Sequence, residues 1–274
     1  DIVHALAGPD VLILQEVMDN SGRRDDGIVS ADKTYARLNA AISSAGGKSY
    51  AVAQVSPPDG ADGGVPGGNI RTAVLFNSER LVLARPRARS TGVAASEGAT
   101  LALGCDGNAV QMRSNPMRLG SGKREFRHSR KPLAALFDVG AEQLLIVGVH
   151  LVSKRGDDGI SGARQPPRKR SSNRRAAQIS WLGSLIARLA PCGSTTHVVL
   201  AGDMNESAGS TQFLPLLDAG LIDTAALLAP GDRYTYVYQG NATQLDQIYV
   251  SARLGRRGIE ADSVHINARY PVSA

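Results

Sequence analysis

The chain has 274 residues, 42% of them hydrophobic and 20% charged, which is ordinary for a globular protein and long enough to bury a sizeable core. Its two cysteines exclude a disulfide framework or a cysteine-rich zinc cluster, and no apolar run approaches the length needed to span a membrane. The net charge of +6 favours polyanionic partners, although only mildly.

The first part of the chain is expected to alternate between helix and strand. Residues 2–6 favour a short helix that a Gly-Pro pair ends, and the apolar run at 10–16 favours a strand. Apolar residues three and four positions apart predict a helix over 30–45, with Ser30 as its cap. A further strand is expected at 49–55.

The middle of the chain predicts two strand pairs, which follow a glycine- and proline-rich loop at 56–69. One pair is expected to join near Asn77, and the other to form a hairpin around Gly140. The four strands cover residues 70–77, 80–85, 132–139 and 143–151. Residues 86–131 show no readable pattern beyond a basic stretch at their end.

The last part of the chain predicts two helices and several strands. A polar loop at 152–171 leads into a helix that begins near Ser172 and ends before Pro191, and a short helix is expected at 210–218. Strands are expected over residues 197–202, 233–238 and 244–250, with another starting at 262–266.

Two of the expected strands, LLIVGV and HVVLA, are continuously apolar, which implies burial on both faces. A sheet covered by helices on one side and by a second sheet on the other buries its strands in this way. Hairpins combined with helical crossovers therefore predict an α/β sandwich in a single domain.

Polar side chains stand at the ends of otherwise apolar strands. They are Glu16, His150, Asp203, Asn205 and Asp246. Carboxylate oxygens are the ligands that Mg²⁺ prefers, and in-line displacement at phosphorus needs a positioned water and stabilised phosphoryl charge. Each residue also has an ordinary explanation: an exposed strand end, a core histidine, or a turn built from Gly, Asp and Asn. The set as a whole indicates phosphoester chemistry.

The chain resembles the endonuclease/exonuclease/phosphatase superfamily, the metal-dependent phosphodiesterase fold of pancreatic-type deoxyribonucleases. Six segments carry the resemblance in order: DVLILQEV, GGNIRTAVLF, SRKPLAALF, LLIVGVHLVSK, VVLAGDMNES and TQLDQIYVS. It extends over the whole chain and implies a four-layer α/β sandwich, with two packed mixed β-sheets flanked by helices. A further stretch, SKRGDDGISGARQPPRKRSSNRRAAQ, is similar to a subgroup of secreted bacterial nucleases and implies a secreted protein.

The resemblance implies a role for each strand-end residue. Glu16 matches a glutamate that binds the metal, for which Mg²⁺ is expected and Mn²⁺ or Ca²⁺ are the alternatives. His150 matches a histidine that assists the phosphate reaction. Asp203 and Asn205 match the pair that orients the attacking water and holds the scissile phosphate, and Asp246 matches an aspartate that supports a catalytic histidine.

Two arginines are expected to bind substrate phosphate. Arg130, in SRKP, matches an arginine that faces the phosphate in the nucleases, and Arg71, in NIR, lies in a motif typical of the secreted subgroup. Basic residues also gather at 118–131 and 164–175, next to strands that end in the expected site. Such a rim suits a nucleic acid backbone, with contacts that are mainly to phosphate and therefore poorly sequence-specific.

The sequence departs from the family pattern at both ends. The family begins with a strand that carries a metal-binding Asn and ends with Ser-Asp-His, and neither element is present in residues 1–274. We therefore expect a single domain of this family without its first strand and terminal segment. Loss of the acid–base histidine forfeits about 10²–10⁴-fold in rate, so this polypeptide alone is expected to be weak or inactive.

A Mg²⁺-dependent nuclease of low sequence specificity is therefore the leading hypothesis. One alternative is a lipid or inositol phosphate phosphodiesterase or phosphatase of the same fold, which an exposed aromatic hairpin would favour; the sequence does not reveal one. Another is a catalytically incomplete nucleic-acid-binding module. No membrane span or obligate protein partner is evident. Cys105 and Cys192 form either one bridge, as in a secreted protein, or two free thiols.

Overall fold

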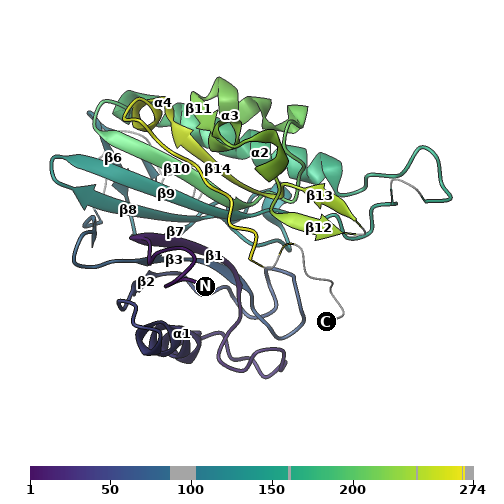
Figure 1. The fold of residues 1–274 in the computed structure, drawn as a ribbon, viewed down its shortest axis with the longest axis horizontal. Coiled ribbons are helices and arrows are strands. Elements are labelled where there is room, and N and C mark those ends of the chain that lie inside the picture. The colour runs from purple at the N-terminus through teal and green to yellow at the C-terminus, as the bar shows by residue number, and fades with distance from the viewer. Residues whose placement is uncertain (87–102, 160–161, 239, 267, 269–274) are drawn as a thin grey trace.

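The computed structural model describes residues 1–86, 103–159, 162–238, 240–266 and 268. Two β-sheets pack face to face, and helices cover their outer faces (Figure 1). This four-layer arrangement confirms the predicted α/β sandwich. None of the helices in the described residues has the length and hydropathy needed to cross a lipid bilayer.

The smaller sheet has three antiparallel strands in the order β1-β3-β2. They are β1 (Val11–Val17), β3 (Arg71–Phe76) and β2 (Ala51–Ala53). Helix α1 (Asp32–Ser44) covers the outer face, where Tyr35 and Ile42 pack against Leu12 and Leu75. The N-cap position is Ala31, and two other side chains satisfy the first N–H groups of the helix: Ser30 Oγ accepts from Asp32, and Asn20 Oδ1 accepts from Lys33 and Thr34.

The larger sheet is mixed, in the order β11-β14-β10-β9-β8-β4, with β7 paired to β8. Its strands are β4 (Val82–Leu83), β7 (Met117–Arg118), β8 (Leu133–Val139), β9 (Glu142–His150), β10 (Thr196–Asp203), β11 (Leu221–Asp223) and β14 (Asp246–Ser251). Strands β8 and β9 form the predicted hairpin around Gly140. The neighbours β9 and β10 run parallel, because helix α2 (Ser172–Arg188) makes the crossover between them.

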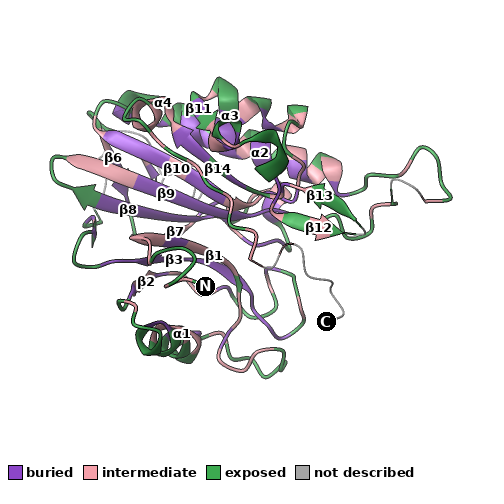
Figure 2. Cartoon of the chain, in the orientation of Figure 1, coloured by how far each residue is buried: buried purple, intermediate pink, exposed green. Residues whose placement is uncertain are grey.

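Both faces of the larger sheet are buried, as the apolar runs predict. Residues of α2 such as Ile179 and Leu182 pack on one face, together with the short helix α3 (Leu214–Asp218). On the other face, Phe76 and Phe137 meet edge to face between the two sheets, with ring centroids 5.0 Å apart. Figure 2 shows the result, a buried middle of β8, β9 and β10 beneath exposed outer helices.

Three local expectations are wrong. Strand β4 does not pair with β3 but with β8, because Asn77 hydrogen-bonds to Asp10 and the chain then crosses to the other sheet. Residues 2–6 form a single turn rather than a helix, and 262–266 form no strand. In the latter segment, Ser263 and His265 hydrogen-bond to the backbone oxygen of Tyr234 instead.

Short elements occupy the described part of the segment that the sequence left unread. Strands β5 (Leu103–Asp106) and β6 (Ala109–Met112) pair with each other, and a 3₁₀ turn follows at Arg124–Phe126. Cys105 of β5 is joined to Cys192 by a disulfide that spans 87 positions and packs beside the end of α2. Of the two alternatives for the cysteines, the structure has the bridge.

Replacing both cysteines by alanine is expected to lower the free energy of unfolding by about 2–5 kcal/mol, because the bridge closes a long loop and so restricts the unfolded chain. Urea titrations with and without reductant measure this loss. Reductant should destabilise the wild type and leave the double variant unchanged. Equal stability of the two proteins without reductant would show that the bridge does not constrain the fold.

Candidate active site

Three of the expected site residues lie in one row across the larger sheet. Asp203, the last residue of β10, is the register partner of His150 at the end of β9 and of Asp246 at the start of β14. Paired residues on neighbouring strands share a face, so the three side chains stand next to one another. His150 Nε2 lies 3.5 Å from Asp203 Oδ2.

Glu16 reaches this row from the other sheet. The register of β1 on β3 shifts between Leu14 and Val17, and Glu16, within this bulge, has a φ of 56°. Such a conformation is costly for a residue other than glycine, and a bulge turns a side chain to a new direction. Glu16 Oε1 lies 4.0 Å from His150 Nε2, and the Glu16 side chain is 68% exposed.

Asn205 fixes the carboxylate of Asp203. The Asn205 backbone N–H donates to Asp203 Oδ1 at 2.7 Å, and the side-chain Nδ2 donates to Oδ2 at 3.0 Å. Nδ2 also donates to the backbone oxygen of Leu151, 3.1 Å away. The Gly-Asp-x-Asn motif is thus a tight turn, and this turn holds the aspartate beside His150.

Arg130 lies near the same carboxylates, which influence its pKa without forming an ion pair with it within 4.0 Å. It is buried, and its Nη2 donates to the Leu151 oxygen at 2.8 Å, the atom that also accepts from Asn205. Burial lowers its pKa, while the nearby Asp203 and Glu16 raise it. An arginine stays protonated in proteins, so a positive charge stands beside the strand-end residues. Its Nε has no hydrogen-bond partner.

We name Glu16, Arg130, His150, Asp203 and Asn205 the strand-end cluster. Within it, burial and the charge of Arg130 lower the pKa of His150 to about 3, so its imidazole is neutral at neutral pH. Burial raises the pKa of Asp203 to about 6; Asp246 and Glu16 add to the rise, and the Asn205 N–H opposes it. The cluster therefore holds a carboxyl group that titrates near neutrality.

The donor set suits a hydrated hard cation. Within the described residues, no three His, Cys, Asp or Glu side chains converge to form a complete metal cage. Mg²⁺ needs no such cage, because it keeps several waters and binds through one or two carboxylates. Glu16 offers a largely exposed carboxylate, and Asp203 has its pKa raised partly by other carboxylates, a repulsion that a cation relieves.

Arg71, the other arginine expected to bind phosphate, has different neighbours. It is buried on β3, and its guanidinium donates to Ser56 Oγ at 2.9 Å and to the backbone oxygen of Asn69 at 3.1 Å. Asn69 in turn donates to Asp19 and Asp59. These contacts tie the loops of the smaller sheet together. The phosphate-binding role of Arg71 stays a prediction.

Sequence reasoning missed the residues that support the cluster from below. Gln178 Oε1 accepts from the Val152 backbone, and Gln178 Nε2 donates to Ser129, the neighbour of Arg130. Arg175, which is 2% exposed, pairs with Glu206 at 3.0 Å and donates to the Val152 oxygen. Both residues lie at the end of the stretch SKRGDDGISGARQPPRKRSSNRRAAQ, and their contacts fix the loops that bear the cluster.

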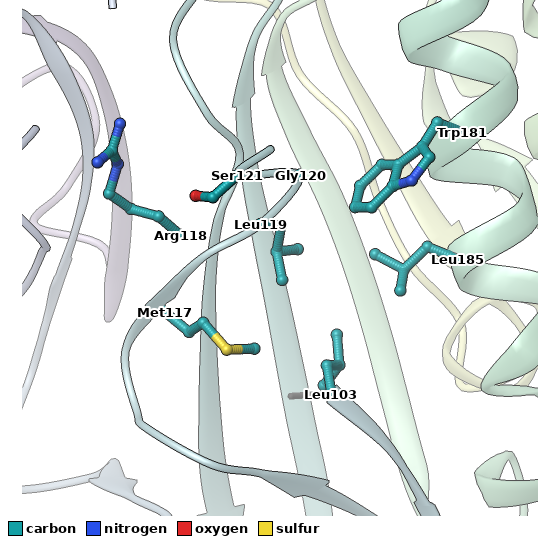
Figure 3. A pocket seen from close by; sticks show the side chains of 8 residues that line it. All are labelled: Leu103, Met117, Arg118, Leu119, Gly120, Ser121, Trp181 and Leu185. Carbon is teal, nitrogen blue, oxygen red and sulfur yellow. The ribbon is translucent and has the colours of Figure 1, made fainter. Parts of the chain in front are cut away.

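A small cavity elsewhere does not compete with the cluster as a site. Figure 3 shows its lining, which includes Leu103, Met117, Trp181 and Leu185, and its volume is about 30 Å³, room for a single water. The Arg118 guanidinium in that view points away toward the smaller sheet, where it pairs with the buried Asp62.

A four-layer sandwich with carboxylates, a histidine and an arginine at the strand ends of its central sheet is the architecture of a family of phosphoester hydrolases. The chain belongs to the Endonuclease/Exonuclease/phosphatase family, whose model matches residues 1–267. Members of this family generally hydrolyse phosphoesters and commonly use divalent metal ions. No curated protein sequence matches the chain.

Solved structures show the same fold at low identity. A D. rerio TDP2 humanized by 14 mutations is 20% identical with a TM-score of 0.51, and the match covers 90% of this chain and 72% of that one. A truncated Caenorhabditis elegans TDP2 is 14% identical, with a TM-score of 0.51 and coverage of 91% and 74%. ANGEL2, a 2′,3′-cyclic phosphatase, is 15% identical, with a TM-score of 0.52 and coverage of 92% and 71%.

Gly202 is expected to be intolerant of any side chain. Its φ is +139°, and an added Cβ would lie 2.1 Å from the Val149 backbone oxygen and 2.8 Å from Gln15 Nε2. We expect Gly202→Ala to lower the free energy of unfolding by about 3 kcal/mol through clash and strain. Gly231→Ala is the matched control, because an added Cβ there meets nothing within 4 Å. Equal denaturation midpoints for the two variants would contradict the close approach of these strands.

Asp203→Asn is expected to stabilise the metal-free protein at neutral pH. The folded-state pKa of Asp203, about 6, lies above its ordinary 3.8, so folding binds a proton and stability falls as pH rises from about 4 to 6. Asparagine has no proton to lose. The variant should therefore gain about 2–3 kcal/mol over wild type above pH 6 and match it near pH 4.

Urea unfolding in chelator at several pH values measures this difference. His150 titrates in the same window with the opposite sign, since its folded pKa is lowered to about 3 and its stability contribution grows as pH rises. The difference between variant and wild type, rather than either profile alone, isolates Asp203. A difference independent of pH would show that Asp203 is not shifted.

Proposed function

We propose that the protein is a Mg²⁺-dependent phosphodiester hydrolase, a nuclease of low sequence specificity that acts on DNA or RNA. The observation that carries the proposal is the strand-end cluster itself. Residues separated by nearly two hundred positions, from Glu16 to Asn205, meet across both sheets with contacts of 2.7–4.0 Å. An ordinary strand end does not need a neutral histidine beside an aspartate of raised pKa, with a buried arginine nearby.

In the proposed reaction, water attacks phosphorus in line with the leaving oxygen. Asp203, held by Asn205 and with a pKa of about 6, orients the water and takes its proton as the new P–O bond forms. Arg130 and His150 lie beside the phosphoryl oxygens and stabilise their charge. The ester P–O bond breaks, and the leaving oxygen takes up a proton from solvent.

Glu16 would hold the metal at the exposed side of the cluster. A bound Mg²⁺ would supply Lewis-acid stabilisation of the phosphoryl and leaving oxygens. Burial raises the pKa of Asp203 most, and Asp246, in register with it, adds to the rise; together they bring this carboxyl near the working range of a base. We also propose for Asp246 the role that the family resemblance implies, the support of a catalytic histidine.

The basic residues near the cluster support a polyanionic substrate, but fewer are available than the sequence suggests. Several are committed to internal contacts: Arg118, Arg130, Lys131, Arg164, Arg174 and Arg175. Exposed basic side chains remain in both runs: Arg124, Arg127, Arg168, Lys169 and Arg170. Contacts from these side chains would be to phosphate, which is why low sequence specificity is proposed.

Secretion is part of the same proposal. The Cys105–Cys192 disulfide supports it, because structural disulfides persist mainly in oxidising compartments.

A lipid phosphodiesterase is the second candidate, because the structure has the exposed aromatic hairpin that the sequence did not reveal. Tyr236 and Tyr238 stand 43% and 55% exposed on one short strand. Tyrosine is common at membrane interfaces, so this hairpin favours a lipid substrate as the alternative to nucleic acid.

The full-length gene product is expected to cleave plasmid DNA or RNA with Mg²⁺ or Mn²⁺ and to lose this activity in chelator. Asp203→Ala should lower the rate by about 10²–10⁴-fold, as expected for removal of a general base. Val82→Ala, at an exposed residue of β4, is the control and should leave the rate unchanged. Cleavage of sphingomyelin but not of nucleic acid would contradict the proposal that the substrate is DNA or RNA. Binding of nucleic acid without cleavage would indicate a binding module.

A further inference from the structure

A short hairpin of β12 (Tyr236–Tyr238) and β13 (Asn241–Thr243) carries tyrosines at alternate positions. Successive residues of a strand point to opposite faces, so alternate residues share one face. Tyr234, just before the hairpin, is buried, and its ring stacks on His265 with centroids 3.8 Å apart. Tyr236 and Tyr238 then emerge into solvent, on a hairpin that is largely exposed (Figure 2).

The two exposed rings lie with their planes nearly parallel. Their centroids are 6.2 Å apart, and the planes differ by 10°. Aromatic rings are usually buried, because burial removes a large apolar area from water. Side chains that keep parallel aromatic faces in water instead offer a surface to a planar, aromatic ligand.

The hairpin is fastened to the strand that forms part of the site. Thr235 Oγ1 accepts hydrogen bonds from the backbone N–H groups of Leu245 and Asp246, both at 3.0 Å. The Thr235 N–H donates to the Thr243 oxygen at 3.1 Å. Asp246 is the register partner of Asp203 in the cluster. Thr235, which holds the backbone of Asp246, directly precedes Tyr236 in the chain.

We propose that Tyr236 and Tyr238 form a stacking platform for unpaired nucleobases of the strand whose phosphate occupies the strand-end cluster. This inference rests on the proposed function and names its substrate class, a single-stranded or locally unpaired polynucleotide. Stacking on aromatic rings accepts every base, in keeping with low sequence specificity. The protein's net charge of +6 complements the phosphate backbone between the bases.

The chemistry of the hairpin favours bases over a lipid surface. A loop that enters a bilayer needs an apolar tip, whereas the described residues after Tyr238 are Gly240, Asn241 and Ala242, with an amide at the turn. Tyrosine also keeps a polar hydroxyl at the end of each ring. Flat parallel faces with polar rims suit bases joined by a charged backbone.

The test measures binding of a fluorescein-labelled single-stranded oligonucleotide in chelator, where no cleavage occurs. Tyr236→Ala and Tyr238→Ala are each expected to weaken binding about tenfold, the effect of losing one stacked base. Tyr238→Phe should bind as wild type, and Tyr238→Leu, which keeps apolar bulk without a ring, should bind as weakly as the alanine variant. Val82→Ala controls for loss of an exposed apolar side chain.

An oligonucleotide of equal length and charge that lacks bases separates stacking from charge. Wild type should bind it more weakly than the base-bearing strand, and the tyrosine variants should bind it as wild type does. Unchanged binding of the base-bearing strand by both alanine variants overturns the platform. A second result also overturns the platform: the alanine variants still bind the oligonucleotide but no longer bind phosphatidylcholine–phosphatidylserine vesicles. That result would assign the hairpin to a membrane.

The two proposals fail in different ways. Metal-dependent cleavage that does not depend on either tyrosine leaves the hydrolase standing and removes the platform. Tyrosine-dependent binding of the base-bearing strand, with no cleavage by the full-length protein, leaves the platform standing and removes the hydrolase.

Discussion

The register of β9, β10 and β14 is the constraint on which the rest of the structure depends. It places Asp203 between His150 and Asp246, and a slip of one residue would turn all of β10 to the opposite face. Gly202 makes this register compatible with the second sheet, since a Cβ there would meet both the Val149 oxygen and the Gln15 side chain. The glycine of the motif therefore serves packing, and the packing brings Glu16 of the other sheet within reach of His150.

This packing gives the cluster its electrostatic character. Burial alone would neutralise both His150 and Asp203, and the pKa values of the two groups move in the directions that burial dictates. Arg130 stays protonated, and its positive charge offsets the negative charge of the nearby carboxylates. A site of this kind is poorly satisfied as it stands: His150 Nδ1 and Arg130 Nε are buried without hydrogen-bond partners. Both atoms lie in the cluster, where the proposed substrate would supply hydrogen-bond partners.

Much of the fold and the core of the cluster could be predicted from sequence because both follow strong local patterns. Continuous apolar runs marked β9 and β10, and polar residues directly after such runs marked the strand ends. The pairing of β4 with β8 could not be predicted, since it depends on the turn that Asn77 makes with Asp10, 67 positions away. Arg71 shows a related difficulty: the sequence places an arginine in a motif but does not show its neighbours, which include Ser56 and the backbone of Asn69. A sequence shows that a charged side chain is present, but it does not show whether that side chain forms hydrogen bonds within the protein.

The same distinction explains how the long polar loop between β9 and α2 relates to the site. Asp157 accepts hydrogen bonds from the Ser171 backbone and hydroxyl, and Ser171 in turn accepts from Arg175. Buried polar residues that satisfy one another fix a loop more sharply than apolar contacts can, because each donor has a defined acceptor. The loop starts at Leu151, whose backbone oxygen receives both Arg130 and Asn205. Part of the basic stretch at 164–175 therefore forms the framework of the cluster, and its other charged side chains remain exposed.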